Sequence, residues 1–203
     1  LYGDESQKET WLPKLATGET IGTLAAVETV QEMTPESINV ESDGKTISGT
    51  KLIVPDGGIA DIAVVLARST DGLSMFIVDL NEGAVSRTNV DTVDPSKNSA
   101  SITFNGAPAE LLGEAGNGWS MLQDIYDRAA VLFAFEQIGG AQKVLDMAVD
   151  YAKQRFAFGR PIGSFQGLKH MMADMYVALK LAESNCFYAA WALANNAADL
   201  STA

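Results

Sequence analysis

The chain contains one cysteine and one histidine among its 203 residues, which restricts the chemistry that it can support. Cys186 has no second cysteine with which to form an internal disulfide, and its apolar helical surroundings predict a buried structural thiol. With His170 as the single histidine, no metal cluster of several histidines can form within this chain. We therefore expect no metal site, and we expect His170 to make a hydrogen bond on a helix surface or at an interface.

Positive charge is also scarce. The chain has 14 Lys and Arg against 26 Asp and Glu, a formal net charge of −12. Non-specific binding to nucleic acid needs rows of basic residues, so DNA, RNA and anionic membrane surfaces are poor candidate partners. No apolar run approaches the roughly 20 residues that cross a bilayer, and no secretory apolar stretch is seen near position 1. We expect a soluble, cytoplasmic globular protein without membrane insertion.

From about residue 18 to residue 113 the pattern is that of β-strands. "INVESDGKTISG" contains two short alternating runs around Asp43-Gly44, and "ADIAVVLARSTDGLSMFIVDL" repeats the arrangement around Asp71-Gly72 with almost continuously apolar flanks. Such pairs are typical of hairpins, because glycine tolerates the positive φ of a tight turn. "VSRTNV" and "SASITFNGAPAELLG" add two candidates. Five to seven short strands predict a closed barrel or a sandwich.

After Gly118 the apolar period becomes helical. A stripe recurs every three or four residues and includes Ala134, Ile138, Ala141, Leu145, Ala148 and Ala152. Gly139-Gly140 lowers helix propensity, which suggests close contact with a neighbouring helix. Gly159-Arg160-Pro161 should end this helix, and a second one is expected from about Ser164 to Asn196.

The break between these helices is unusually basic and aromatic. Lys153, Arg155 and Arg160 lie within a stretch that has no acidic residue between Asp150 and Asp174. One interpretation is that Arg155 compensates the partial negative charge at a helix C-terminus. The other is that its guanidinium binds a phosphate or pyrophosphate, with Phe156, Phe158 and Phe165 excluding water and Gln166 adding an amide. Spacing alone does not decide between them.

A family resemblance bears on this choice. "RFAFGRPIGSFQGLKHMMADM" resembles the segment "RxxFGxPIxxFQxxxxxxADM" of the acyl-CoA dehydrogenases. Looser similarity extends through "QKETWLPKLATGETIGTLAAVE", "GTKLIVPDGGIADIAVVLAR" and "GNGWSMLQDIYDRAAVLFAFEQIGGAQKVLDMAVDYAKQR". The resemblance implies an α+β fold and a segment of a longer polypeptide. Residues 1–17 would end an N-terminal helical domain, residues 18–114 would form a middle β-barrel domain, and residues 115–203 would begin a C-terminal four-helix bundle.

The same resemblance implies an activity. Members of the family use FAD to oxidise the Cα–Cβ bond of an acyl-CoA thioester and pass electrons to an electron-transfer flavoprotein. In the family's tetramer, the segment that matches Arg155, Phe165 and Gln166 contacts FAD bound mainly by the neighbouring subunit, and Phe158 belongs to the same segment. The basic break would then meet the cofactor's pyrophosphate across a subunit interface.

The general base of the family is missing from the matched positions. In many members it is a Glu that would lie beyond residue 203, and in others a Glu at the position of Ala129, which cannot accept a proton. Glu136 is the nearest carboxylate along the helix, about two turns further on, and we interpret it as a polar group at a helix contact. Asp127 matches a position that the family uses near the CoA thioester, although a helix-start aspartate is an equal alternative.

The strands that would face the flavin also depart from the family pattern. Val27, Ile53 and Pro55 stand where Thr, Trp and Thr are common, and "TVQEMTP" replaces a glycine-rich turn after Glu28. Each lost hydrogen bond to the flavin ring is worth about 0.5–1.5 kcal/mol net, unless backbone amides compensate. Three functions remain open: an FAD-dependent acyl-CoA dehydrogenase, a non-catalytic subunit that completes the flavin site of a homologous chain, or an unrelated helix-barrel protein whose basic break binds a phosphate ligand. The assembly would be a homotetramer in the first case or a heterotetramer in the second.

Overall fold

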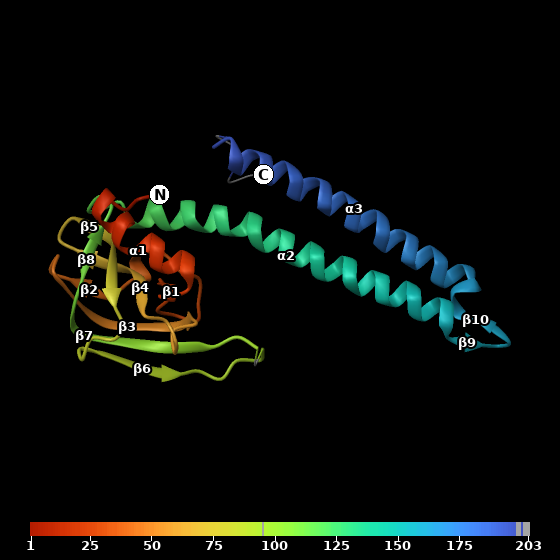
Figure 1. Ribbon diagram of the computed structural model, residues 1–203, viewed down its shortest axis with the longest axis horizontal. Coiled ribbons are helices and arrows are strands. Elements are labelled where there is room, and N and C mark those ends of the chain that lie inside the picture. Colours follow the sequence, from red (N-terminus) through yellow and green to blue (C-terminus); the bar gives the residue numbers. More distant parts are fainter. Residues whose placement is uncertain (95, 198–199, 201–203) are drawn as a thin grey trace. The chain divides into compact units, whose positions relative to one another are not determined.

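The computed structural model describes residues 1–94, 96–197 and 200. The chain divides into two units, Leu1–Gln123 and Asp124–Ala203, which are drawn in Figure 1. The first unit carries helix α1 and the main β-sheet, and the second carries most of helix α2, a small hairpin and helix α3.

Helix α1, Glu5–Thr17, has its ends specified by the local sequence. The Asp4 side chain accepts a hydrogen bond from the Gln7 backbone N–H at 2.8 Å, and the Gln7 side chain accepts one from the Asp4 N–H, so the pair forms a capping box. Gly18 ends the helix in the left-handed conformation at φ 75°. The Gln7 amide also donates to Glu110 and to the Leu111 carbonyl oxygen, which fastens α1 to the sheet.

The main sheet has eight strands within the described residues, paired in the order β6-β7-β3-β2-β4-β5-β8, with β1 pairing β4. The strands are β1 Gly22–Ala25, β2 Glu41–Ser42, β3 Thr46–Pro55, β4 Ile62–Ser69, β5 Gly72–Asp79, β6 Val85–Asn89, β7 Ser99–Pro108 and β8 Glu110–Leu112. A short 3-10 helix, η1 Pro35–Ser37, lies in the connection before β2. Most pairs are antiparallel, whereas β4 pairs in parallel with β1 and β2.

Both predicted hairpins are confirmed. β2 and β3 pair around Asp43-Gly44, and β4 and β5 pair around Asp71-Gly72, with Gly44 and Gly72 at positive φ. β4 and β5 are buried along almost their whole length, as their continuous apolar sequences predict. Their side chains build the core with Ala25, Val40, Ile47, Val54, Ile102 and Phe104.

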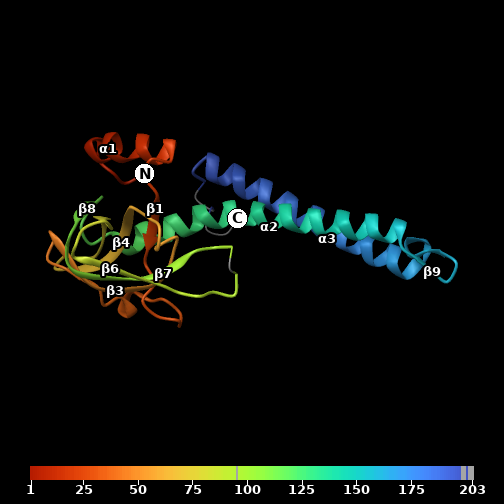
Figure 2. The same cartoon turned by 60° about the horizontal axis from the view of Figure 1, so that its bottom comes forward.

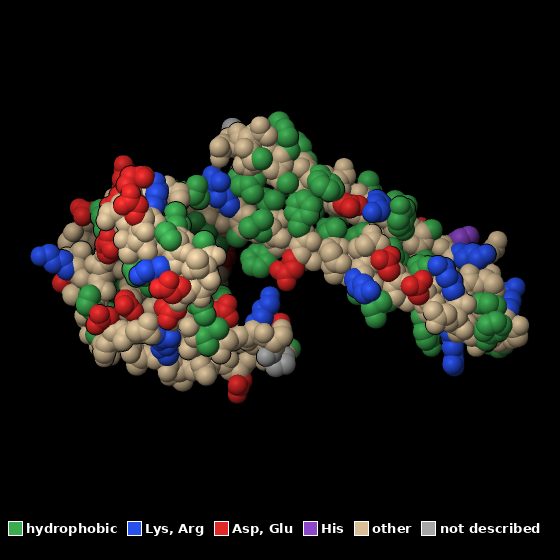
Figure 3. Space-filling model, in the orientation of Figure 1, with side chains coloured by type: hydrophobic (Ala, Val, Ile, Leu, Met, Phe, Trp, Pro, Cys, Tyr) green, Lys and Arg blue, Asp and Glu red, His purple; other side chains and the backbone are tan. Residues whose placement is uncertain are grey.

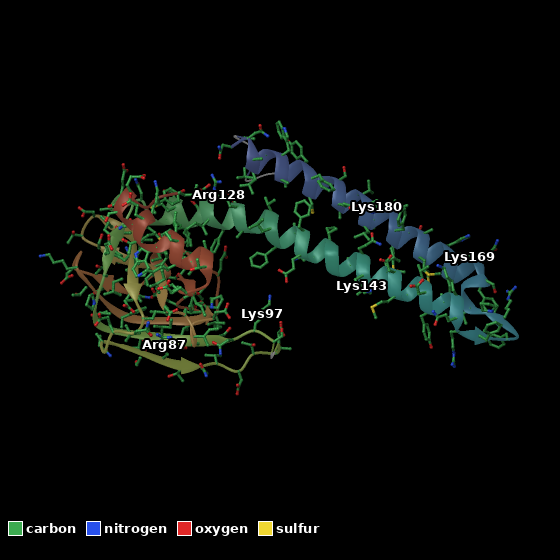
Figure 4. The ribbon with its side chains drawn as sticks, in the orientation of Figure 1. Arg87, Lys97, Arg128, Lys143, Lys169 and Lys180 are labelled. Carbon is green, nitrogen blue, oxygen red and sulfur yellow. The ribbon has the colours of Figure 1, made fainter. Side chains whose placement is uncertain are left out.

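The sheet was expected to close into a barrel or to form a sandwich. Among the described residues, β6 and β8 end the order of paired strands and are not paired with each other. The hydrogen bonds therefore establish one continuous mixed sheet and do not show closure. Arg87 of the edge strand β6, labelled in Figure 4, donates to the carbonyl oxygens of Ala60 and Leu80 and so ties this edge to the loops beside it.

The second unit is a helical hairpin. α2, Gly118–Gln154, begins in the first unit and continues into the second, where α3, Gln166–Ala194, follows it. Both Figure 1 and Figure 2 show the two helices side by side and antiparallel, and the rings of Phe135 and Phe187 meet edge to face at 5.5 Å. Cys186 is buried in α3, as predicted, and His170 is exposed on the same helix.

Many other apolar side chains of both helices are exposed, although Leu145 and Ala152 of the predicted stripe are buried, and Figure 3 shows apolar side chains gathered over α2 and α3. The exposed members include Leu132, Phe133, Val144, Met147, Tyr151, Met175, Leu181 and Trp191. A Cβ built on Gly139 or Gly140 would meet no other atom within 4 Å, so the close contact expected there is not made by the described residues. Within the described part of the chain, no helix has the length and hydropathy to cross a bilayer.

Candidate functional site

The basic break folds into a tight hairpin between the two long helices. Strand β9, Phe156–Ala157, pairs antiparallel with β10, Arg160–Pro161, and a 3-10 turn, η2 Ile162–Ser164, leads into α3. The backbone N–H of Ile162 donates to the Arg155 carbonyl oxygen at 2.8 Å, which closes the hairpin at its base. Sequence reasoning predicted the end of the helix but missed the hairpin.

The two residues at the hairpin tip both have positive φ, 53° for Phe158 and 77° for Gly159. This combination defines the type I′ turn that matches the twist of paired strands, and its first central position favours Asn, Asp or Gly. A bulky residue there is a backbone outlier that costs on the order of 1–3 kcal/mol. Because Phe158 is also 96% exposed, its ring gains little from burial within this unit. Strain and exposure together mark Phe158 as a candidate binding residue.

Phe165 links the hairpin to the start of α3. Its ring meets that of Phe158 edge to face at a centroid distance of 6.3 Å, and the Arg160 guanidinium carbon lies 4.1 Å from the centroid of the same ring. This separation is within the range of a cation–π interaction. Arg160, one of the basic residues of the break, therefore packs on the ring of Phe165.

Arg155 lies one residue beyond α2, with its backbone N–H bonded to the Tyr151 carbonyl oxygen. The neighbouring Lys153 is paired with Asp150 at 3.5 Å, whereas within the described residues Arg155 is exposed and takes part in no ion pair. Its fork of donors is thus available to an anion. Gln166, the exposed first residue of α3, follows Phe165, which makes no side-chain cap hydrogen bond. Lys169, labelled in Figure 4, adds a further cation to this end of α3.

A second cluster lies in the first unit, where the structure brings Val27 beside the strand that contains Ile53 and Pro55. The Leu52 backbone N–H donates to the Val27 carbonyl oxygen at 2.8 Å, and the Pro55 carbonyl oxygen accepts a hydrogen bond from the Thr23 hydroxyl at 2.5 Å. Ile53 is 43% exposed and has a φ of 49°, which is a clear outlier for a β-branched residue. A strained, exposed side chain thus falls at a predicted cofactor-contacting position.

Sequence reasoning missed Lys51, which lies beside this cluster. Its side chain is fully buried, and its Nζ donates to the Ala26 carbonyl oxygen at 3.0 Å and to Glu28 Oε1 at 2.5 Å. Burial lowers the pKa of Lys51 to about 8, and the Glu28 carboxylate partly opposes that shift. The sequence contains a signal for this burial. Lys51 lies four residues after Ile47, and because side chains alternate along a strand, both point to the same inward face of β3.

The two positions taken from the family's substrate site lie on α2 in the second unit. Asp127 and Ala129 are both half-buried, and Arg128 between them bonds the two Asp124 oxygens at 3.0 and 3.1 Å. Ala129 carries no proton-accepting group, so this position cannot supply a base. Val27, Ile53 and Pro55 belong to the first unit, and Arg155, Phe158, Phe165 and Gln166 to the second.

Comparison with known proteins gives a consistent result. Residues 116–203 match the family described as "Acyl-CoA dehydrogenase, C-terminal domain". An acyl-CoA dehydrogenase of Bacillus subtilis is 31% identical over 203 residues, which are 93% of this chain and 54% of that protein. The chain therefore spans about half the length of the curated relatives that it matches.

Solved structures agree in fold. An acyl-CoA dehydrogenase from Geobacillus kaustophilus superimposes with a TM-score of 0.88 at 25% identity, over 98% of this chain and 56% of its own. A glutaryl-CoA dehydrogenase from Mycobacterium smegmatis in complex with FADH2 has a TM-score of 0.85 at 24% identity, over 92% and 50% of the two chains. The second likeness supports the mixed α+β fold alone.

Proposed function

The chain belongs to the acyl-CoA dehydrogenase family, and on this premise we propose that it works in an FAD-dependent acyl-CoA dehydrogenase. The reaction is the α,β-dehydrogenation of an acyl-CoA thioester, with electrons passed to an electron-transfer flavoprotein. FAD, when bound, supplies the acceptor for the hydride that leaves the substrate β carbon. The parts of this chain that serve the reaction are those that bind the cofactor and the substrate.

The observation that carries the proposal is the hairpin at residues 155–166. Arg155 is exposed and in no ion pair among the described residues, while the strained Phe158 projects beside Phe165. A guanidinium and aromatic rings carried by one short hairpin suit a ligand that combines a pyrophosphate with flat heterocycles, as FAD does. Gln166 would add an amide, and Phe158 and Phe165 would exclude water from the anion.

In the first unit, Val27, Ile53 and Pro55 would form the surface against the flavin ring. Their side chains carry no hydrogen-bond donor, so this surface would bind the ring through apolar contact and backbone groups. The exposure and positive φ of Ile53 support such a role, because strain of this kind clusters at ligand sites. Asp127 would lie near the CoA thioester.

The proposal extends to architecture and assembly. We assign residues 1–17 to the end of an N-terminal helical domain, residues 18–114 to a middle β-barrel domain and residues 115–203 to a C-terminal four-helix bundle. The exposed apolar residues of α2 and α3 support a bundle, since contiguous apolar surface marks an interaction site. Arg155 would reach FAD bound mainly by a neighbouring subunit of a cytoplasmic tetramer.

A second candidate is a non-catalytic subunit that completes the flavin site of a homologous chain in a heterotetramer. The observation in its favour is the chemistry of the replaced positions. Ala129 cannot act as a base, and neither Val27 nor Ile53 has a side-chain hydrogen bond to offer the flavin. This chain would then provide the Arg155 hairpin to its partner while the partner's own β-domain holds the ring.

Purification of the intact protein distinguishes the two candidate functions. The intact protein, expressed alone, should be yellow, and an acyl-CoA should bleach its flavin absorption. Arg155→Ala should lose flavin while its far-UV circular dichroism stays unchanged, whereas Lys153→Ala, two residues away and already paired with Asp150, should keep it. Colourless protein that acquires flavin only when co-expressed with a homologous subunit would establish the second candidate. Full flavin content in Arg155→Ala would refute the role of the hairpin.

A further inference from the structure

One buried ammonium group ties together two backbone segments of the first unit. Lys51 Nζ donates to the Ala26 carbonyl oxygen at 3.0 Å and to Glu28 Oε1 at 2.5 Å. Val27 lies between these two acceptors, and its own carbonyl oxygen accepts from the Leu52 N–H at 2.8 Å. Residues 26–28 are thereby held against residues 51–52 on both sides of Val27.

The Glu28 carboxylate has further partners that fix its orientation. It accepts hydrogen bonds from the backbone N–H of Asn39 at 2.6 Å and of Val40 at 3.1 Å. These bonds close residues 29–38 into a loop whose two ends meet at Glu28. The carboxylate cannot turn away from Lys51 without also releasing the end of that loop, so the ion pair and the loop stabilise each other.

Directly after Lys51, strand β3 contains a bulge. Lys51 is opposite Ile102 of β7 and Val54 is opposite Ala100, so that Leu52 and Ile53 together face a single residue, Ser101. A bulge of this kind redirects a side chain, and the residue redirected is the strained Ile53. A backbone outlier persists only where its surroundings determine it. Lys51 supplies such a restraint at the residue directly before the bulge.

We propose that Lys51 is a positioning residue that, with Glu28, holds Val27 and Ile53 in the arrangement that receives the flavin ring. This inference rests on the proposed function, in which both residues face FAD. Side chains at 27 and 53 offer no hydrogen bond, so recognition there falls to backbone groups and apolar surface. Backbone recognition depends on where the backbone is held, and the buried ion pair holds both segments at once.

The test uses the intact protein with FAD, in two variants. Lys51→Met keeps an unbranched side chain and removes the charge. Lys51→Met/Glu28→Gln also neutralises the partner while Gln keeps an acceptor for Asn39 and Val40, so it avoids the destabilising unpaired carboxylate that Lys51→Met alone leaves. We expect at least a tenfold rise in the FAD dissociation constant, a shift of the flavin absorption bands, and faster amide hydrogen exchange in residues 26–28 and 51–54.

The control is Phe104→Leu, a destabilising change at a buried β7 residue opposite Gly49 and Val85. It should leave the flavin bands and FAD affinity unchanged, which separates positioning from general loss of stability. Unchanged FAD affinity and bands in both Lys51 variants would overturn the inference, even if hydrogen exchange became faster. A wild-type protein that binds no FAD, alone or with a homologous subunit, would instead refute the proposed function on which the inference rests.

Discussion

In the first unit most large apolar side chains of the long strands β4, β5 and β7 are buried against one another, whereas in the second many apolar side chains are exposed along α2 and α3. The β unit even buries a charged residue, Lys51, together with the carboxylate that pairs with it. The helical unit instead exposes Phe133, Met147 and Trp191. The comparison indicates that the β unit completes its core within this chain. The helical unit presents a surface suited to further helices, in agreement with the proposed bundle and tetramer.

The difference in burial between the two units can be tested by truncating one phenylalanine in each. Phe104→Ala should lower the free energy of unfolding by about 3–5 kcal/mol, because it opens a cavity in a packed core. Phe133→Ala, at an exposed position of α2, should have little effect on this chain studied as a monomer. Urea unfolding followed by circular dichroism measures both. Similar losses in the two variants would contradict the difference between the units.

Removing the carboxylate that pairs with Lys51 tests whether the buried ion pair stabilises the β unit. Glu28→Ala should cost about 3–5 kcal/mol of unfolding free energy, since it leaves the Lys51 charge buried and unpaired. The matched control is Glu36→Ala, which changes an exposed glutamate of η1 and should leave the unfolding midpoint unchanged. If the two variants unfold at the same urea concentration, the ion pair does not stabilise the β unit.

The same lysine predicts a pH dependence of the stability of the β unit. The pKa of Lys51 is lowered from 10.5 to about 8 by burial, so between these values the unfolded state binds a proton that the folded state has lost. The free energy of unfolding should therefore rise with pH in this window, by up to about 1.4 kcal/mol per pH unit. Below pH 8 Lys51 is charged in both states, so the cost of burying its charge is present in full. Lys51→Met should abolish this component. The measurement is the wild-type minus variant difference in urea unfolding free energy from pH 7 to 11, and a flat difference would disprove it.

The smallest expected effect concerns the strained hairpin tip. Phe158→Asn places Asn before Gly159, the combination that a type I′ turn prefers, and should stabilise the folded state by about 1 kcal/mol. Phe156→Asn, on the adjacent strand without positive φ, should give no such gain. If Phe158 contacts FAD, Phe158→Asn should also weaken flavin binding, so that stability and cofactor affinity change in opposite directions. A variant that is less stable than wild type in thermal unfolding would remove the argument from strain.

Several elements were predictable because their signals are local. Asp43-Gly44 and Asp71-Gly72 each form a turn between strands, since glycine alone readily adopts the required φ. The second helix was expected from about Ser164 and begins at Gln166. The basic and aromatic character of residues 153–166 predicts a candidate site in this segment, although it does not predict that the segment forms a hairpin.

Other features depend on contacts between distant residues. The predicted roles of Val27, Ile53 and Pro55 came from family resemblance, and nothing in their local sequence indicates that Ile53 lies in a bulge opposite Ser101. The place of β7 beside β3 likewise results from pairing between residues that are 44 to 62 positions apart in the sequence, from Pro55–Ser99 to Thr46–Pro108. Close helix packing at Gly139-Gly140 was inferred from propensity, but no neighbouring helix of the described chain comes within 4 Å of a Cβ built on either glycine.

By itself the sequence determined the periods of the strands and helices, the turns between them and the position of the basic break, because these follow from the conformational preferences of adjacent residues. Only the tertiary structure decided that Lys51 is buried, that Glu28 pairs with it, and that Ile53 and Phe158 are held at positive φ. The physical reason is that burial and strain are properties of a residue's surroundings. Segments far apart in the chain create those surroundings only when they pack.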